Sequence, residues 1–223
     1  MFKLIKLIAL GVLFISALNP AFSTDFGLNL SGERNFNLNH NVGSNELRFN
    51  SSAPLEDIVG YVDKDAISSS VTLNPANIEN ATGTVIFKVN GMETGIKTRD
   101  EHLHGPNWLD ASQFPEIKFE LKNLKDVKIV QKDPPLGRAT AEATAVGVFT
   151  MRGISKNITS KVKITFVKES DFTRKRANGD FLFVEGSFSI KLADFNVQGT
   201  KGVIGSKVGK EIDITYKLFY NSN

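Results

Sequence analysis

Apolar and polar residues alternate in one segment after another, and this two-residue period constrains the fold most. In residues 84–90, Val85, Phe87 and Val89 fall on one face and their polar neighbours on the other. Such alternation is typical of a β-strand with one buried face. The same pattern predicts strands at residues 47–50, 58–62, 67–73, 117–122, 139–150, 158–167, 181–192 and 211–219. No segment after residue 23 keeps a helical period of 3.6, so an all-β domain is expected.

Short turn sequences separate these segments, among them 74–77, 133–137 and 174–180, which are rich in Asn, Pro, Gly and charged residues. About eight strands joined by hairpin-length turns predict either an antiparallel sandwich or a closed up-and-down barrel. The period alone does not distinguish the two. A closed barrel of about eight strands has room for one small or elongated ligand.

Residues 1–23 have the features of a secretory signal peptide. A short basic start containing Lys3 and Lys6 precedes an apolar run from Leu7 to Leu18, and small residues, Ala21 and Ser23, occupy the positions that a signal peptidase reads. Cleavage is predicted after Ser23, and an uncleaved membrane anchor is the alternative. The mature protein is expected to be periplasmic or secreted, without stable membrane insertion. Residues 24–46 are predicted to form an N-terminal arm or weak edge strand, and residues 47–223 the barrel domain.

Composition narrows the function classes. The chain has no cysteine, which excludes disulfides and thiolate catalysis. Loss of Lys3 and Lys6 with the signal peptide reduces the formal charge of +3 by two, to +1. A charge this small gives no electrostatic footprint for nucleic acid, so no nucleic-acid partner is expected. The 17 Phe residues have no polar handle and are expected to be buried.

One polar stretch, residues 98–110, interrupts the strands. It holds the only Trp, two of the three His and an Arg-Asp pair. A polar segment of this length in a β-rich chain indicates short helices of its own or a functional role. We expect Asp100 to cap a turn that runs through His104, and Asn107 to cap a second turn that carries Trp108.

Three blocks of residues in this order resemble the YceI-like family of secreted bacterial proteins. The first block consists of Thr94-Gly95-Ile96, Arg99-Asp100-Glu101-His102-Leu103, Trp108-Leu109-Asp110 and Phe114-Pro115-Glu116-Ile117. The second is 147–156, and the third is 186–190 with Ala193-Asp194-Phe195. Asn196 departs from the family's usual Gly, but Asn tolerates positive φ, so the turn is expected to form. The resemblance implies a lipocalin-like antiparallel barrel with a short helical insertion around residues 99–112. It also implies an elongated interior pocket for a polyisoprenoid or similar long-chain amphiphile.

Given this resemblance, the inward faces of the strands are expected to line a tunnel for an apolar chain. The predicted tunnel residues are Val85, Phe87, Val89, Phe119, Phe149, Ile164, Phe166, Phe188 and Ile190. The alternative is that the same side chains pack into a dry core. The predicted mouth and head-group residues are Thr98, Arg99, Asp100, His102 and Trp108. Arg99 is the best partner for a phosphate or carboxylate; the alternative is an internal ion pair of Arg99 with Asp100 or Asp110.

The function predicted from these residues is a non-enzymatic carrier or sequestering protein for a long-chain isoprenoid or acyl amphiphile, with no cofactor and no catalytic residues. His102 and His104, with Asp100, Asp110 or His40, are the only metal-ligand candidates, and no metal site is expected. The alternatives are a metal-dependent hydrolase built on the His102/His104 loop, or a ligand-free stress-protective interaction module. A homodimer is compatible with the sequence. Six basic residues are expected to form a solvated rim of the barrel, and the alternative is that they make a weak contact with anionic membranes. These residues are Lys161, Lys163, Lys168, Arg174, Lys175 and Arg176.

Overall fold

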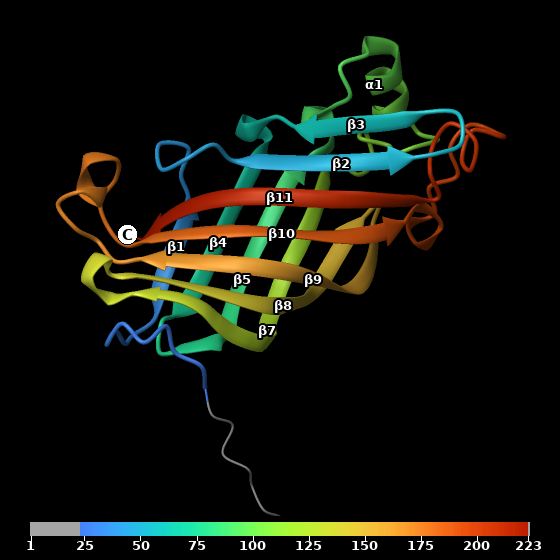
Figure 1. Ribbon diagram of the computed structural model, residues 1–223. Helices are drawn as coiled ribbons and strands as arrows, with labels where there is room; N and C mark the ends of the chain where they lie inside the picture. The colour runs from blue at the N-terminus through green and yellow to red at the C-terminus, as the bar shows by residue number, and fades with distance from the viewer. Residues whose placement is uncertain (1–22, 223) are drawn as a thin grey trace, which may run out of the picture.

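The fold is a closed antiparallel β-barrel, described by a computed structural model for residues 23–222 (Figure 1). The predicted signal peptide, apart from Ser23, lies outside the described residues. The barrel strands, in ring order, are β1 (Arg34–Leu38), β4 (Ile67–Asn74), β5 (Asn77–Lys88), β7 (Glu116–Asp133), β8 (Arg138–Met151), β9 (Ile154–Val167), β10 (Phe181–Lys191) and β11 (Glu211–Ser222). Because β1 pairs with both β4 and β11, the ring of eight strands is complete. The barrel alternative is therefore confirmed over the sandwich.

Three further strands extend the sheet from β11. They are β2 (Glu46–Ser52), β3 (Asp57–Val62) and β6 (Met92–Glu93). β11 pairs with β1 through its last residues, 220–222, and with β2 through residues 212–217. β6 follows β5 through the 3-10 helix η2 (Val89–Gly91). The barrel thus has a different closing element at each end, namely β1 at one and β2, β3 and β6 at the other.

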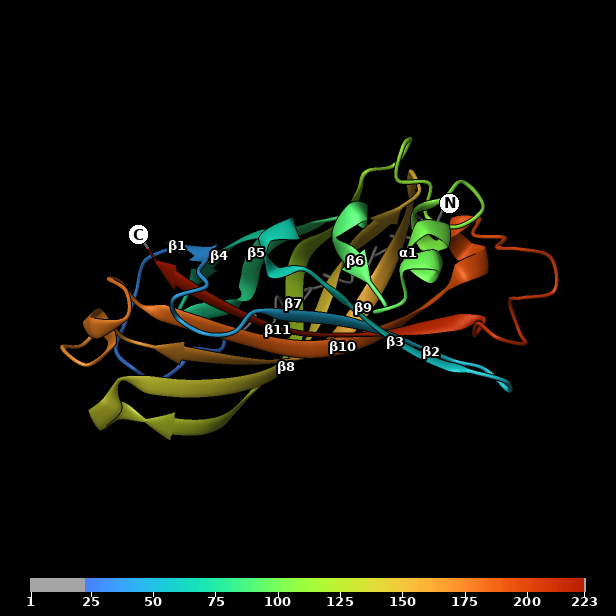
Figure 2. The same cartoon turned by 90° about the horizontal axis from the view of Figure 1, so that it is seen from above.

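The predicted helical insertion is confirmed as α1 (Lys97–His104), the one α-helix within residues 23–222. Short 3-10 helices lie in the connections: η1 (Lys64–Ala66), η3 (Pro134–Leu136), η4 (Thr173–Lys175) and η5 (Leu192–Phe195). Within residues 23–222, no helix is long and apolar enough to cross a membrane. In both views α1 and the connection between η5 and β11 lie at one end of the barrel, and the hairpin turns of β7–β8 and β9–β10 lie at the other (Figures 1 and 2).

The end of the barrel that carries β1 is filled by aromatic side chains, and we call it the packed end. Phe26 stacks on Phe166 with ring centroids 5.5 Å apart, and Phe36 meets the same ring edge-on at 6.2 Å. All three rings are fully buried. Ala139, the register partner of Phe166 on β8, has a small side chain that leaves room for them. Residues 24–46 were expected to form an arm or weak edge strand. They contribute the Phe26 side chain, which fills this end of the barrel, and the strand β1, which pairs with β4 and β11.

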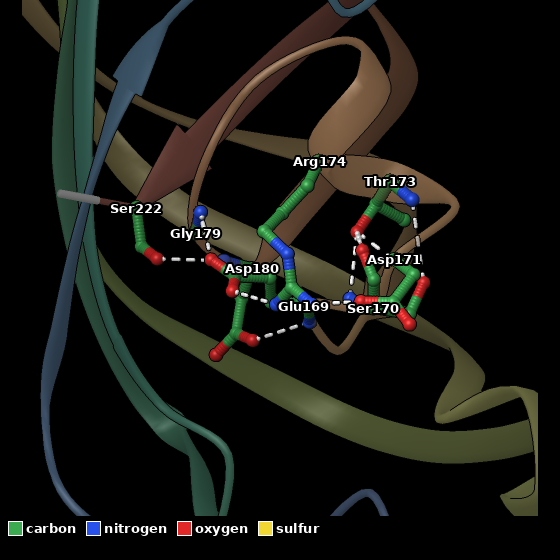
Figure 3. Close-up of polar contacts among 8 residues, drawn as sticks. All are labelled: Glu169, Ser170, Asp171, Thr173, Arg174, Gly179, Asp180 and Ser222. Atoms are coloured by element: carbon green, nitrogen blue, oxygen red, sulfur yellow. Dashed lines mark hydrogen bonds and ion pairs between the residues drawn. The ribbon is translucent and has the colours of Figure 1, made fainter.

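A polar network at the packed end links the β9–β10 connection to the end of β11 (Figure 3). The Asp180 carboxylate accepts hydrogen bonds from Arg34 Nε at 2.7 Å and from the Glu169 backbone N–H at 2.8 Å. The Asp180 N–H donates to Ser222 Oγ at 2.9 Å, and Arg174 pairs with Glu169. These bonds join β1, the β9–β10 connection and the end of β11, so they fix the closing strand in place.

Two local expectations have definite outcomes. Asn196 has φ of 53° and ends η5 in the left-handed conformation, as expected for an Asn in place of Gly. β7 is much longer than the predicted strand 117–122, because register shifts after Leu121, Lys125 and Ile129 break the two-residue period while pairing with β8 continues.

Candidate functional site

A large apolar cavity occupies the end of the barrel opposite the packed end, and we call this the hollow end. Its volume is about 510 Å³, within the ordinary range for small-molecule sites. The lining comes from the inner faces of the strands, from α1 and the residues after it, and from the connection between η5 and β11. The lining residues are Leu47, Phe49, Ser51, Glu56, Ile58, Phe87, Met92, Thr94, Ile96, Thr98, Arg99, His102, Leu103, Trp108, Leu109, Ile117, Phe149, Met151, Ile190, Leu192, Val197, Thr200, Val203, Lys207, Val208, Ile212 and Ile214.

Polar groups of this lining are few, and Arg99 on α1 is the best placed to bind an anion. Its Nη1 contacts Glu56 Oε1 at 2.6 Å, and its Nε donates to Thr94 Oγ1 at 3.1 Å. The Arg99 side chain is 24% exposed and that of Glu56 is 42% exposed. A guanidinium has five N–H donors, so these two contacts leave donors for a further acceptor. The alternative, an internal ion pair of Arg99 with Asp100 or Asp110, is wrong, because Arg99 pairs instead with Glu56, which is distant in sequence.

Asp100 has a structural part instead. Its Oδ1 accepts hydrogen bonds from the Thr94 N–H at 2.8 Å and from Thr94 Oγ1 at 2.6 Å. The helix begins at Lys97 after the N-cap Ile96, so Asp100 lies inside the first turn and not at the cap. The predicted turn through His104 is confirmed, but the capping role is wrong. Asp100 holds the Thr94 turn under Arg99, and it is not among the cavity-lining residues.

Trp108 lies at the junction between the segment after α1 and the η5–β11 connection. The Trp108 N–H donates to the Gly105 carbonyl at 3.0 Å and closes the turn that carries Trp108. Asn107 therefore lies within this turn and does not cap it. The Gly199 N–H donates to the Asn107 carbonyl at 2.9 Å. Gly199 has φ of 63°, and a Cβ there would approach the Trp108 ring to 2.9 Å. A glycine is therefore required for this close contact.

Arg152 holds the same segment from the opposite side. Its guanidinium donates to the carbonyl of Pro106 at 3.1 Å and to that of Trp108, and it lies 5.8 Å from the Phe114 ring centroid. Arg152 has positive φ at the tight turn between β8 and β9. The sequence motif at residues 147–156 includes Arg152 but assigned it no role, because its hydrogen-bond partners are over forty residues away.

A second, smaller chamber of about 80 Å³ lies deeper in the barrel. Leu47, Phe87, Phe149 and Ile214 line both chambers, so these four side chains form the wall between them. Phe149 is held edge-on between Phe188 and Phe195, with both ring centroids 5.5 Å away. The interior of the barrel thus consists of an outer cavity, an apolar wall of these four side chains and a small inner chamber.

The inner chamber contains buried hydroxyl groups. Tyr216 Oη and Ser160 Oγ are 2.8 Å apart, and Ser160 Oγ donates to the Ser187 carbonyl at 2.9 Å. Tyr220 Oη likewise lies 2.9 Å from Ser69 Oγ. Burial raises the pKa of Tyr216 to about 12, although the Ser160 hydrogen bond acts in the opposite direction. Burial also raises the pKa of Tyr220. Both tyrosines are therefore neutral at physiological pH.

The predicted tunnel residues are distributed over four environments. Phe87, Phe149 and Ile190 line the outer cavity, and Val85, Phe119, Ile164 and Phe188 line the inner chamber, with Phe87 and Phe149 shared. Phe166 lies at the packed end, and Val89 is buried in η2 outside both linings. The predicted mouth residues Thr98, Arg99, His102 and Trp108 line the outer cavity.

The sequence pattern gave no role to a large part of the lining. Val197, Thr200, Val203, Lys207 and Val208 lie in a connection without strand periodicity. The residues of β2 and β3 that line the cavity lie in predicted strands, whereas Met92 of β6 does not. The position of all three strands depends on long-range pairing, of β2 with β11, of β3 with β2 and of β6 with β3.

The histidines do not converge. His104 Nε2 lies 2.9 Å from the Met92 carbonyl oxygen, and His40 Nδ1 is 3.0 Å from Asn45 Nδ2. His102 faces the cavity, and Asp110 accepts from Ser112 Oγ. Within residues 23–222, no group of three or more His, Cys, Asp or Glu side chains is arranged to hold a metal ion. The His102/His104 loop therefore presents no assembled ligand set for hydrolysis.

The basic residues of the predicted rim are largely paired. Lys163 lies 3.2 Å from Glu185, Arg174 contacts Glu169 and Asp171, and Arg176 donates to the Val42 carbonyl at 2.9 Å. Ion pairs between exposed groups of this kind are typical of a solvated surface.

An eight-stranded antiparallel barrel with one short helix and an apolar cavity at one end defines a lipocalin-like β-barrel domain. Residues 39–219 match the YceI-like domain, and the chain belongs to this family. The resemblance seen in the motif blocks is thereby confirmed.

Individual relatives are distant in sequence. A UPF0312 protein of Yersinia pestis strain Pestoides F is 25% identical over 139 residues, which are 62% of this chain and 64% of that protein. A UPF0312 protein of Yersinia enterocolitica serotype O:8 is 26% identical over 140 residues, with the same coverage. The matched region thus spans just under two thirds of the length of these relatives.

Solved structures share the fold. BcnA of Burkholderia cenocepacia superposes with a TM-score of 0.60 at 19% identity, covering 78% of this chain and 95% of that one. A polyisoprenoid binding domain from Saccharophagus degradans, implicated in plant cell wall breakdown, gives 0.58 at 13% identity, covering 84% and 98%. At these identities the likeness establishes the fold alone.

Proposed function

We propose that this protein binds a long-chain lipophilic molecule, a polyisoprenoid or fatty-acid-like amphiphile, and carries or sequesters it without chemical change. The observation that carries this proposal is the apolar cavity of about 510 Å³, whose lining includes Arg99. The description of the Saccharophagus degradans relative as a polyisoprenoid binding domain supports the same ligand class.

Burial of the apolar chain provides the binding energy. Each CH₂ group removed from water contributes about 0.8 kcal/mol, and the outer cavity presents Phe, Leu, Ile, Met and Val side chains to receive it. Such binding needs no directional chemistry along the tail. It selects for length and shape through the volume available.

The head group is placed at α1. Arg99 offers charge-assisted hydrogen bonds to a phosphate or carboxylate, and Thr98 and His102 line the cavity beside it. Glu56 holds the guanidinium at 2.6 Å and fixes its orientation. An anionic head group would share Arg99 with Glu56, whose side chain is partly exposed and able to move aside.

The predicted signal peptide supports a periplasmic or extracellular location for this activity. There a carrier of this kind would keep an insoluble chain dispersed between membranes, since water does not dissolve it. The proposal needs no cofactor, no catalytic residue and no metal.

The decisive experiment is native mass spectrometry of protein isolated from its own host, followed by solvent extraction of whatever co-purifies. We expect a stoichiometric lipophile with a long apolar chain. Protein that carries no lipid and binds none on addition would contradict the proposal and favour a ligand-free interaction module. Stoichiometric zinc would favour a hydrolase instead.

Phe87→Lys tests the position of the tail. Phe87 is buried and lines both chambers, so a charge there should abolish lipid retention while secretion continues. Val59→Lys is the matched control, because Val59 is 60% exposed on the outer face of β3 and its substitution should leave retention unchanged. Lipid retention at wild-type occupancy by Phe87→Lys would contradict the placement of the tail.

A further inference from the structure

Glu79 on β5 faces the backbone nitrogen of Thr24 with both carboxylate oxygens. The Thr24 N to Oε1 distance is 3.0 Å, and the distance to Oε2 is 2.9 Å. Both residues are half-buried. The two carboxylate oxygens thus lie at nearly equal distances from one main-chain nitrogen, which belongs to the first residue after the predicted cleavage site.

The position of Thr24 is fixed by the arm and does not depend on Glu79 alone. The Ile78 N–H donates to the Thr24 carbonyl at 3.0 Å, and the Phe26 N–H donates to the Pro75 carbonyl at 3.0 Å. Phe26, two residues further on, is fully buried against Phe166. The nitrogen of Thr24 is therefore held beside Glu79 by the same contacts that plug the packed end.

The chemistry of this contact fits an amine better than an amide. An amide N–H has one hydrogen, which two carboxylate oxygens must share. An α-ammonium group has three hydrogens and a full positive charge, so it satisfies both oxygens with charge-assisted bonds. The ion pairs formed within residues 23–222 do not include Glu79, which leaves its charge without another cationic partner there.

We infer that the Ser23–Thr24 bond is the processing site and that the new amino terminus docks on Glu79. Signal peptidase adds water across this bond, which leaves a carboxylate on Ser23 and an amine on Thr24. The amine takes up a proton at neutral pH, since α-amino groups have a pKa near 8. The resulting Thr24 ammonium pairs with Glu79 and locks the arm, with Phe26, into the packed end.

The site of cleavage is tested by exporting the full chain with its own signal peptide and measuring the intact mass and amino-terminal sequence of the exported protein. We expect Thr24 as the first residue. Cleavage at any other bond would overturn this inference, although the signal peptide would still be removed. An uncleaved chain would overturn this inference and the predicted signal peptide cleavage together. Neither outcome bears on whether the barrel binds a lipid.

The ion pair is tested by a double-mutant cycle on the stability of the protein. Chains that begin at Thr24 and at Ser23 are each compared with their Glu79→Gln variants by urea denaturation. In the Thr24-start protein we expect Glu79→Gln to lower the folding equilibrium constant about tenfold, and in the Ser23-start protein by less than about twofold. Equal losses in the two backgrounds would overturn the ion pair.

Two controls keep the test interpretable. Glu33→Gln removes an exposed carboxylate from the same arm and should change neither background. The unsubstituted Ser23-start protein is a second probe that leaves Glu79 in place, and it should be less stable than the shorter Thr24-start protein. If it is equally or more stable, the docked ammonium contributes nothing and the inference fails.

Discussion

The two ends of this barrel are built from the same kind of strand, yet the interior is filled at one end and hollow at the other. At the packed end, Phe26, Phe36 and Phe166 fill the interior, and the arm seals it. At the hollow end, Phe87 and Phe149 have the same inward direction but border a cavity of about 510 Å³. The difference arises from what covers each opening: the packed end receives an aromatic side chain from outside the ring, whereas the hollow end receives a helix with no buried residue.

The polar groups divide in the same way. Arg34 and Asp180 form an ion pair at the packed end, with side chains 22% and 12% exposed, whereas Arg99 and Glu56 form one at the hollow end with 24% and 42%. Asp180 has further backbone and side-chain partners, whereas Glu56 has a carboxylate partly open to solvent. The Arg34–Asp180 pair is part of the scaffold, whereas the Arg99–Glu56 pair is placed where Arg99 can bind another anion in place of Glu56.

The largest expected effect comes from removing a ring at each end. Phe166→Ala should lower the free energy of unfolding by about 3–5 kcal/mol, the usual range for a buried Phe. Phe87→Ala should cost about half as much, because one side of that ring already faces empty space and makes fewer contacts. Urea denaturation of lipid-free protein measures both. Equal losses at the two positions would mean that the ends are packed alike, and the comparison would fail.

A smaller effect is expected from the two arginines, and it should separate stability from binding. Arg34→Gln should lower the free energy of unfolding by about 1–3 kcal/mol, since it leaves Asp180 without its cation, and should leave ligand affinity unchanged. Arg99→Gln should weaken an anionic long-chain ligand about tenfold and change stability by less than about 1 kcal/mol.

Titration calorimetry with a fatty acid and with the corresponding alcohol checks the role of Arg99. The alcohol should bind both the wild type and Arg99→Gln alike, because it carries no charge. If Arg34→Gln weakens the fatty acid as much as Arg99→Gln does, the head group is not located at α1.

The smallest effect concerns the buried tyrosines and is absent at neutral pH. The pKa of Tyr216 is raised from 10.0 to about 12 in the folded state, so the folded protein retains a proton that the unfolded chain releases between these values. The contribution of Tyr216 to stability is therefore constant below about pH 10 and falls as the pH rises toward 12, by roughly 1 kcal/mol per pH unit. Urea denaturation across this range measures the fall, and Tyr216→Phe should reduce its slope. A slope that Tyr216→Phe leaves unchanged would contradict the buried environment of this hydroxyl.

Alternation in the sequence was sufficient to predict most strands and an all-β domain, whereas the barrel followed from the resemblance of the motif blocks, and neither predicted how the barrel closes. β1 pairs with residues 70–73 and 220–222, and no local pattern in 34–38 specifies partners so distant in the chain. The helical insertion was predicted from a polar stretch between strands, although its start at Lys97 was missed because Ile96 provides no side-chain cap.

The candidate site was predicted in part for a physical reason. Phe166 and Phe87 have the same alternation, so the sequence does not distinguish a ring in the packed end from one that borders a cavity; only the arm, docking from outside the ring, decides it. Arg99 was identified by its chemistry, but its partner Glu56 comes from the β2–β3 connection. The connection from Val197 to Val208 has no period and could not be assigned to the lining.

The difference between the closing elements at the two ends of the barrel affects how a ligand reaches the outer cavity. The ring of eight strands is complete without β2, β3 and β6, and β3 meets β6 through only two register pairs, Tyr61 with Glu93 and Val62 with Met92. Segments with few backbone bonds open at lower free energy than the rest of a fold. Separation of β3 from β6 breaks only these two pairings and leaves the eight-stranded ring and the packed end intact, so we expect a ligand to enter past β6 without loss of barrel stability.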